Sequence, residues 1–352
     1  MNKWYVDTGP DSDVVISSRV RLARNFNNYP FPHRSLPEQQ EQIIKETCEA
    51  LFSDNPKLKE TFSLIRLNDL SPIERLVLIE KHLISKELAE SNLISGALIS
   101  RDEQVSIMIN EEDHLRIQCL ATGMQLEKAF DICNYLDNVI ADKIDYAFSN
   151  TVGYLTSCPT NVGTAIRVSV MLHLPALTMT GYIKPILESC GKLGLAVRGL
   201  YGENTEAYGN MYQLSNQVTL GKNENDIVMS VKNISYQIIE QERLMRIELL
   251  NKNSIKLADR IMRSYGILRY AQSLSSDEAL QRLSDIRLGI NLGLIRDLSE
   301  KDISVMFLMI QPGNLQQHEK RELGPEERDI ARANYVRKYM EKDNNMGNDK
   351  LI

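Results

Sequence analysis

The sequence predicts an α+β protein in which a mixed catalytic domain (residues 1–245) precedes an all-α domain (residues 246–352). Short apolar runs of strand length, separated by turn residues, lie in the first two-thirds of the chain. From about residue 223 onward apolar residues recur at helical spacing, and no strand signal of comparable strength follows. With 43% hydrophobic and 25% charged residues, the 352-residue chain has the balance of a globular protein.

The first domain combines predicted strands with two well-marked helices. One helix begins at Pro72, where Ser71 can cap it and Glu74 can reach back as a capping-box glutamate. Its apolar spacing continues to Leu83 and Ile84, and a second helix covers residues 125–141. The predicted strands are Gly96–Ser100, Val105–Ile109, Leu115–Leu120, Leu195–Arg198 and Met211–Thr219.

The second domain is predicted to contain only helices. A long charged helix over residues 223–251 joins it to the first domain, so the boundary near residue 245 falls within a helix. Further helices are expected at residues 253–271, 276–289, 298–310 and 325–342.

Composition and missing motifs exclude several classes of function. The net charge of −6 argues against a nucleic-acid-binding surface, and no apolar run approaches the roughly 20 residues that span a membrane. The polar N-terminus has no signal-peptide core, so we expect a cytoplasmic protein. The five scattered cysteines form no CxxC pair, and no metal site is expected. Glycine-rich phosphate loops and protein-kinase motifs are also missing, so any phosphate must be bound by side chains.

Four short segments carry chemistry that composition does not explain. They are Val15–Arg24, Asn110–Arg116, Ser157–Met171 and Arg198–Glu203. In a strand, Arg19 and Arg21 point to one face, where they repel each other unless an anion lies between them. Taken singly, each segment has an ordinary structural interpretation, such as a solvated strand face, a surface turn or a buried small cysteine.

Together the four segments resemble the phosphagen kinase family of ATP:guanidino phosphotransferases. The acidic signature Asn110–Arg116, the motif that begins at Cys158 and its nine-residue spacing to Arg167 carry the resemblance, which covers residues 13–245. It implies a phosphagen-kinase-like antiparallel sheet flanked by helices, with ATP and Mg²⁺ as cofactors. The residues that it assigns to ATP are Ser17, Ser18, Arg19, Val20, Arg21, His82, Arg116, Arg167, Val168, Ser169, Val170, Met171, Arg198, Gly199, Leu200, Tyr201, Gly202 and Glu203.

The acceptor in this family is a guanidino group, which is a poor nucleophile because its pKa lies above about 12. It needs carboxylates that orient it and accept its proton. We predict Glu112 as the base and Glu203 as a second carboxylate that grips the guanidinium when a glycine loop closes. Cys158 is expected to steer the same group as a thiolate.

Within the family, the chain is most similar to the bacterial protein arginine kinases. The arginine pair lies so close to the N-terminus that the helical N-terminal domain of the metabolite kinases has no room. The subfamily implies arginine-bearing protein substrates marked for a Clp protease, inactivation of a stress-response repressor, an activator protein and a homodimer. It also implies an allosteric phosphoarginine site at Arg328, Asp329, Arg332 and Ala333, where four-residue spacing places both arginines on one helix face.

Two other functions stay open at this point. One is a metabolite kinase that acts on free arginine or another guanidino compound, and the other is a non-catalytic adaptor that binds phosphoarginine. The complete set of arginines together with two glutamates argues against the adaptor, because a binding module has no need of them.

Overall fold

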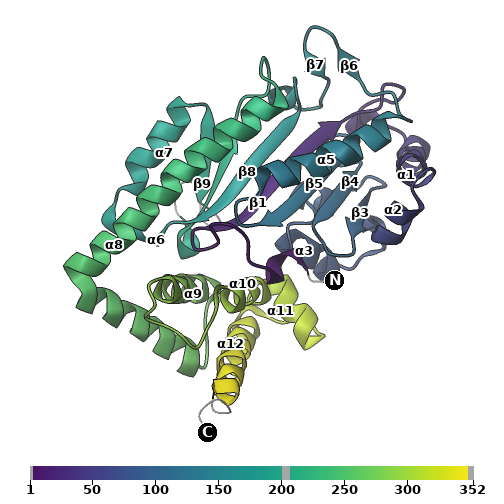
Figure 1. The fold of residues 1–352 in the computed structure, drawn as a ribbon. Helices are drawn as coiled ribbons and strands as arrows, with labels where there is room; N and C mark the ends of the chain where they lie inside the picture. Colours follow the sequence, from purple (N-terminus) through teal and green to yellow (C-terminus); the bar gives the residue numbers. More distant parts are fainter. Residues whose placement is uncertain (1–2, 200–206, 348–352) are drawn as a thin grey trace.

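A computed structural model describes the backbone of residues 3–199 and 207–347, with side chains up to residue 341. Its centre is one eight-stranded sheet in the order β2-β3-β4-β5-β1-β8-β10-β9, in which every neighbouring pair is antiparallel (Figure 1). The strands are β1 (Val15–Arg24), β2 (Phe62–Arg66), β3 (Gly96–Ser100), β4 (Val105–Ile109), β5 (Leu115–Thr122), β8 (Ile166–His173), β9 (Leu195–Gly199) and β10 (Met211–Asn216). A small hairpin of β6 (Phe148–Ser149) and β7 (Gly153–Tyr154) extends from this body.

Helices complete the first part of the chain. They are α1 (Pro37–Phe52), α2 (Pro56–Thr61), α3 (Pro72–Glu80), α4 (Lys86–Glu90), α5 (Leu126–Ala141), α6 (Pro175–Thr180) and α7 (Ile183–Lys192). The helices α5 and α8 lie across one face of the sheet in Figure 1, and the main core fills the space between them and the strands. On the opposite face, α3 and α4 cover the β3–β4 end, and α9 reaches β8, where His173 Nε2 lies 2.8 Å from Ser284 Oγ. Between them the middle of the sheet borders an open cleft.

Most of the predicted elements are confirmed, with shifts at their ends. The capping box at Ser71 and Glu74 is present, but α3 ends at Glu80 instead of continuing to Ile84. The chain turns there because His82 takes a left-handed conformation (φ 58°). Leu83 and Ile84 are buried in the turn that follows, so their apolar spacing reflects burial and not helix.

The C-terminal part is helical, as the sequence predicts. The helices are α8 (Glu224–Tyr270), α9 (Ser276–Asn291), α10 (Glu300–Met309), α11 (Pro312–Glu319) and α12 (Pro325–Gly347), and no strand occurs between residues 217 and 347. The two helices predicted at 223–251 and 253–271 form the single helix α8, which has a break at Asn253 (φ −138°, ψ 36°). These helices enclose a second core; the boundary at residues 245/246 stays a prediction.

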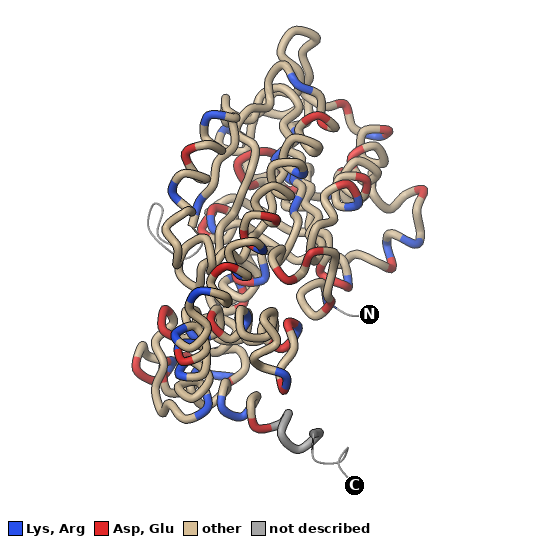
Figure 2. Tube along the Cα trace, turned by 60° about the vertical axis from the view of Figure 1, so that its left-hand side comes forward, with Lys and Arg blue, Asp and Glu red and all other residues tan. Residues whose placement is uncertain are grey.

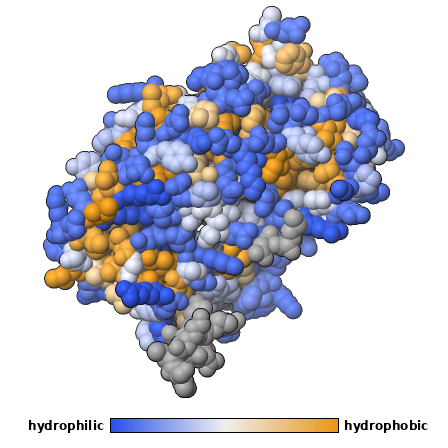
Figure 3. Space-filling view, viewed as in Figure 1, coloured by the Kyte–Doolittle hydropathy of each residue, from blue (hydrophilic) through white to orange (hydrophobic). Residues whose placement is uncertain are grey.

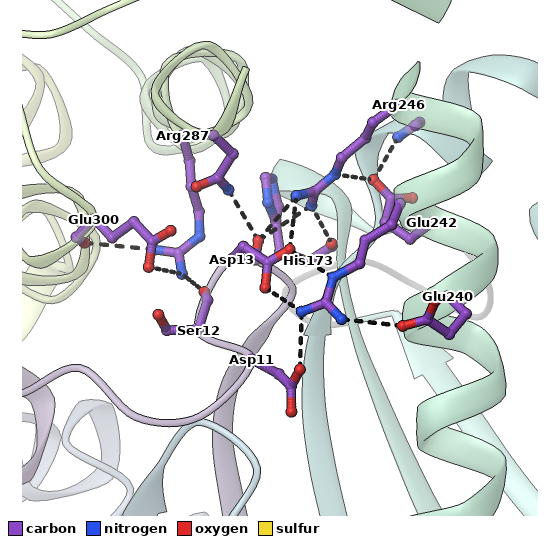
Figure 4. A network of polar contacts seen from close by, with 12 residues as sticks. Asp11, Ser12, Asp13, His173, Glu240, Glu242, Arg246, Arg287 and Glu300 are labelled. Carbon is purple, nitrogen blue, oxygen red and sulfur yellow. Dashed lines mark hydrogen bonds and ion pairs between the residues drawn. The ribbon is translucent and has the colours of Figure 1, made fainter. Parts of the chain in front are cut away.

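A polar network joins the two cores through the N-terminal segment (Figure 4). The Arg287 Nη2 of α9 donates to the Ser12 carbonyl (2.5 Å), and the Asn291 amide donates to that of Asp13 (2.9 Å). From α8, Arg246 donates to the same Asp13 carbonyl (3.2 Å) and pairs with the buried carboxylate of Glu242 (2.8 Å). The N-terminal segment is thus held between the sheet and the helical region.

The surface mixes both signs of charge. Lys and Arg lie interspersed with Asp and Glu along most of the chain (Figure 2), so the cationic group described below is a local feature of an acidic protein. Among the residues that the structure describes, no helix is long and apolar enough to cross a membrane. All five cysteines are free thiols.

Candidate active site

A solvent-open cleft of about 1440 Å³ lies on the uncovered face of the sheet. Antiparallel register brings its arginines together: Arg21 is paired with Arg167 across β1 and β8. Arg116 projects from β5 and Arg198 from β9 into the same cleft. Because paired residues in a sheet point to the same side, strands that are distant in sequence deliver one cluster of guanidinium groups.

The arginine cluster is electrostatically strained. Burial, followed by the charges of Arg167 and Arg116, lowers the pKa of Arg19 to about 10. The pKa of Arg21 is also lowered, chiefly by burial and then by the charge of Arg19. Within the described chain, the buried Nε atoms of Arg21 and Arg167 have no hydrogen-bond partner. Repulsion and unused donors both favour a bound anion, and guanidinium forks match the paired oxygens of a phosphate.

One arginine of the cluster is held by acids. Arg116 Nη1 donates to Glu111 Oε1 (2.6 Å), and its Nη2 lies 3.3 Å from Glu112 Oε2. The Glu111 side chain is 1% exposed and also accepts a hydrogen bond from Ser85 Oγ (2.5 Å). Glu111 is therefore a fixed support for Arg116 and is not free to act on a substrate.

Glu112 differs from its neighbour because it is exposed at the edge of the cleft. Its pKa is raised by partial burial and then by the charge of Asp113, while Arg116 acts in the opposite direction. A carboxylate with a raised pKa is a better proton acceptor than an ordinary one, provided that it is ionised at the working pH. This is the property that a base for a guanidino group requires.

Two further residues of the acidic signature point away from the cleft. Asp113 Oδ1 accepts hydrogen bonds from the Asn25 amide (2.6 Å) and from the Ser157 backbone N–H (2.7 Å). His114 Nδ1 accepts from the Phe26 backbone N–H (3.0 Å). These contacts tie the acidic loop to the segment that carries the cysteine motif.

Cys158 lies in the wall of the cleft, where Arg167, Glu112 and Thr160 also line the space. It directly precedes a 3-10 turn (Pro159–Asn161), and its Sγ is 3.0 Å from Thr160 Oγ1. The structure thus places the predicted thiol and the predicted base in one cavity. Glu203, together with Leu200, Tyr201 and Gly202, lies outside the described residues.

The residues predicted to bind ATP fall on both faces of the sheet. Ser17, Ser169 and Met171 line a smaller cavity beside the arginines, and Gly199 ends β9. Four others point the opposite way, with buried side chains in or beside the core: Ser18, Val20, Val168 and Val170. A strand alternates its side chains, so these four residues can reach a ligand on the open face only through their backbone.

His82 sits at the turn after α3 and borders the same smaller cavity. Burial, and then the charges of Arg19 and Arg21, lower the pKa of its imidazole to about 4. The ring is therefore neutral near pH 7 and adds no further positive charge to the cluster. Gln118 Nε2 fixes the turn by donating to the His82 carbonyl (2.7 Å).

The predicted phosphoarginine site is more enclosed than the sequence suggests. Arg332 pairs with Asp329 (2.5 Å), as its three-residue spacing allows. However, the Arg332 side chain is 1% exposed, and its guanidinium donates to the carbonyls of Ile310 (3.0 Å) and Leu274 (2.7 Å). The Arg332 guanidinium is thus occupied by these contacts in the structure and does not face solvent. Arg328 is half-buried and Ala333 fully buried.

No group of three or more His, Cys, Asp or Glu side chains in the described chain is arranged to hold a metal ion. Glu112 is one carboxylate with a free edge on the cleft. Mg²⁺ prefers phosphate oxygens, water and one or two carboxylates, so the cleft suits an ion that arrives with the nucleotide.

Comparison with protein families places both parts of the chain. Residues 42–245 match the ATP:guanido phosphotransferase C-terminal catalytic domain, and residues 254–351 match the protein-arginine kinase McsB C-terminal domain. The protein-arginine kinase of Bacillus subtilis is 49% identical over 342 residues, which is 97% of this chain and 93% of that protein. The protein-arginine kinase of Brevibacillus brevis is 48% identical over 339 residues, 96% of this chain and 95% of that protein.

Solved structures agree on the fold. A lombricine kinase superposes with a TM-score of 0.59 at 23% identity, over 67% of this chain and 68% of that chain. The duplicated taurocyamine kinase of Schistosoma mansoni, in a structure with transition-state-analogue components, gives a TM-score of 0.59 at 26% identity over 71% of this chain and 37% of that one.

Proposed function

The chain belongs to the ATP:guanido phosphotransferase family and acts as a protein-arginine kinase, and we propose how its cleft divides the work of the reaction. The arginine cluster holds the triphosphate of ATP. Glu112 acts on the arginine side chain that accepts the phosphoryl group. The observation that carries this proposal is the convergence of five arginines with Glu112 and Cys158 in one cleft.

Phosphoryl transfer needs positioning and charge stabilisation more than covalent help from the protein. Transition-state charge spreads over the oxygens of the transferred group. Arg19, Arg21, Arg167 and Arg198 supply fixed donors there, and Arg116 is held in place by Glu111. Cations that are already placed before the reaction lower its barrier without reorganising. Mg²⁺ supplies further charge neutralisation when bound with the nucleotide.

The acceptor is an arginine side chain carried by a protein. We propose that Glu112 orients its guanidinium and takes the proton that leaves as the N–P bond forms. In the same step the bond between the γ-phosphorus and the β,γ-bridging oxygen breaks, and ADP is the leaving group. Cys158 steers the same group from the adjoining wall, and Glu203 contributes a second carboxylate. Clamping by separate groups converts a weak, charged nucleophile into an aligned one.

A direct test is incubation with Mg-ATP and a mixture of proteins, followed by mapping of acid-labile phosphate. We expect phosphate on arginine, and loss of it in the Glu112→Ala and Cys158→Ala variants. Free arginine is offered in a parallel reaction. If free arginine were phosphorylated efficiently while the proteins stayed unmodified, the result would favour a metabolite kinase instead.

The proposed function also includes where the enzyme works and which proteins it works with. We propose that it works in the cytoplasm on proteins that a Clp-type protease then degrades, and that it inactivates a stress-response repressor with the help of an activator protein.

Arg328 and Asp329 would sense phosphoarginine if α12 loosened enough to free the Arg332 guanidinium. Charge reversal of Arg328 should then abolish activation by phosphoarginine and leave ATP affinity unchanged.

We also propose a homodimer formed through the helical region. Apolar side chains are exposed along the second half of α8: Ile255 is 84%, Met262 52% and Tyr270 71% exposed. Figure 3 shows hydrophobic patches on the side of the molecule where α8 bends. Light scattering after gel filtration should give a dimer for the natural chain and a monomer for an Ile255→Asp, Met262→Asp variant.

A further inference from the structure

Arg19 is held in the cleft by uncharged side chains. Its Nη2 donates to Gln213 Oε1 (2.9 Å), and its Nε donates to Ser169 Oγ (3.4 Å). Arg116 is held differently, because its partner is the carboxylate of Glu111 (2.6 Å). Within the described residues, Arg19 forms no ion pair with a carboxylate. Its neutral partners therefore fix the guanidinium without cancelling its charge.

The sheet explains how Arg19 reaches Gln213. Arg19 on β1 is paired with Ser169 on β8, and Gln213 lies on β10, the next strand beyond β8. Neighbouring strands are about 4.8 Å apart, so the Arg19 side chain crosses β8 to meet the amide. Ser169 lies on this path, and its small side chain leaves room for the longer one. Arg19 and Gln213 together border both the cleft and the smaller cavity beside it.

An amide suits this position better than a carboxylate of the same size would. Because the oxygen of Gln213 accepts from a guanidinium, the orientation of the amide is set and its NH2 group stays available as a donor. A glutamate here would also bind Arg19, but it would offset one positive charge of the cluster. It would in addition place a negative charge beside a bound phosphate and have no proton to donate to it.

We propose that Gln213 is a positioning residue for phosphoryl transfer, which holds the Arg19 guanidinium at the phosphate site and leaves its positive charge to act on the nucleotide. This inference rests on the proposed binding of the triphosphate to the arginine cluster. Stabilising the transition state requires a cation that is placed before the reaction and is not neutralised by the protein. An acid at position 213 would meet only the first requirement, and a side chain without an acceptor would meet only the second.

The first test is Gln213→Glu, which keeps the length of the side chain and adds a charge. The Kd for Mg-ATP and the Kd for magnesium tripolyphosphate, which carries the phosphates without the nucleoside, should both rise about tenfold, or about 1.4 kcal/mol. Both affinities should also depend less on salt, since one cation fewer acts on the phosphates.

The matched control is Gln217→Glu. Gln217 directly follows β10, is exposed and does not line the cleft, so the same charge is added outside the site. We expect both Kd values to stay within about twofold of those of the natural chain.

The second test is Gln213→Met, which keeps the length of the side chain and removes the acceptor. Arg19 then keeps its charge but loses its fixed position, so kcat should fall about tenfold while the Kd for Mg-ATP stays within about threefold of the natural value. The two variants thus separate binding from turnover: added charge weakens binding, and lost positioning slows the reaction. A side chain that only filled space would not produce this separation.

Arg19→Gln distinguishes failure of this inference from failure of the proposed function. If Arg19→Gln binds tripolyphosphate as tightly as the natural chain does, Arg19 holds no phosphate and both proposals fail. If Arg19→Gln binds it more weakly but Gln213→Glu does not, only the role of Gln213 is wrong. Equal losses of affinity and turnover in Gln213→Glu and Gln213→Met would mean that Gln213 only shapes the cleft, which also overturns the inference. Should Gln213→Met fail to fold, the affinities of Gln213→Glu still decide.

Discussion

Glu112 is exposed at the cleft edge, and its pKa is raised by burial and by Asp113. A base works only when deprotonated, so kcat/KM should rise with pH through that raised pKa and level off above it. Glu112→Gln should lower kcat about 100- to 10,000-fold with little change in the Kd for ATP. Steady-state kinetics across the acidic pH range measure both effects.

The control for this variant is Glu87→Gln. Glu87 also lines the cleft and is exposed, but within the described residues its carboxylate forms no ion pair with an arginine. We expect its kcat to stay within about threefold of the natural value. A Glu112→Gln enzyme that kept most of its activity would mean that another group accepts the proton.

Asp113 acts at a distance from the reaction, through the segment that carries Cys158. Asp113→Ala removes hydrogen bonds to a charged acceptor from Asn25 and Ser157, and should lower the free energy of unfolding by about 3 kcal/mol. The loosened segment should also make the Cys158 thiol react faster with iodoacetamide. Denaturation and alkylation rates measure the two effects, with the exposed Asp131→Ala on α5 as control. An unchanged alkylation rate at lower stability would mean that Asp113 supports the fold only.

At the scale of elements, α11 docks on α3 through one carboxylate and one glycine. Glu80 accepts from the backbone N–H groups of Gly313 (2.6 Å) and Asn314 (2.8 Å) and from the Asn314 amide (2.7 Å). A Cβ at Gly313 would lie 2.8 Å from Leu76 Cγ and 3.0 Å from the Val77 backbone nitrogen. The two helices can approach this closely only because residue 313 is glycine.

Because the two helices approach so closely, a glycine-to-alanine substitution should have opposite effects on stability at Gly313 and at Gly266. Gly313→Ala should lower the free energy of unfolding by about 1–3 kcal/mol, because α11 must move away from α3. Gly266→Ala in α8 meets no atom within 4 Å and should raise it by about 0.5–1 kcal/mol, because alanine favours helix. Chemical denaturation of both variants provides the comparison. A neutral Gly313→Ala would show that α11 does not rest on α3 in solution.

The same elements show what a sequence can and cannot predict. Local signals were sufficient for α3, whose capping box spans Ser71 and Glu74. They were also sufficient for β3 and β4, because burial on both faces gives these strands largely apolar sequences. The prediction missed β2 and β8. The docking of Glu80 on Gly313 joins residues 233 positions apart, and nothing local marks either of them.

In the candidate site, too, some features could be predicted from the sequence and others could not. The resemblance supplied the arginines and Glu112, and the sheet register brings them together. Strand alternation could have separated Arg19 from Val20, whose side chain is in the core. The burial of Arg332 depends on carbonyls from α10 and from the turn before α9, so helix spacing alone could not reveal it.

For the whole molecule, the network in Figure 4 decides whether the two cores unfold together. Arg287 is 2% exposed and binds the Ser12 carbonyl from α9, so it connects the helical core to the segment that enters β1. Arg287→Leu leaves that carbonyl without its donor, and we expect a loss of about 2–3 kcal/mol.

The shape of the transition is the more specific measurement. Calorimetry of the natural chain should give one cooperative transition, because each core lends contacts to the other through Asp13. Arg287→Leu should split it, with the helical region melting first, since that region loses its hold on the N-terminal segment. Arg263→Leu is the matched control, because Arg263 is 75% exposed and, within the described residues, pairs only with Asp259 one turn away on α8. A single sharp transition retained at lower Tm in Arg287→Leu would show that the other contacts of the network suffice to couple the two cores.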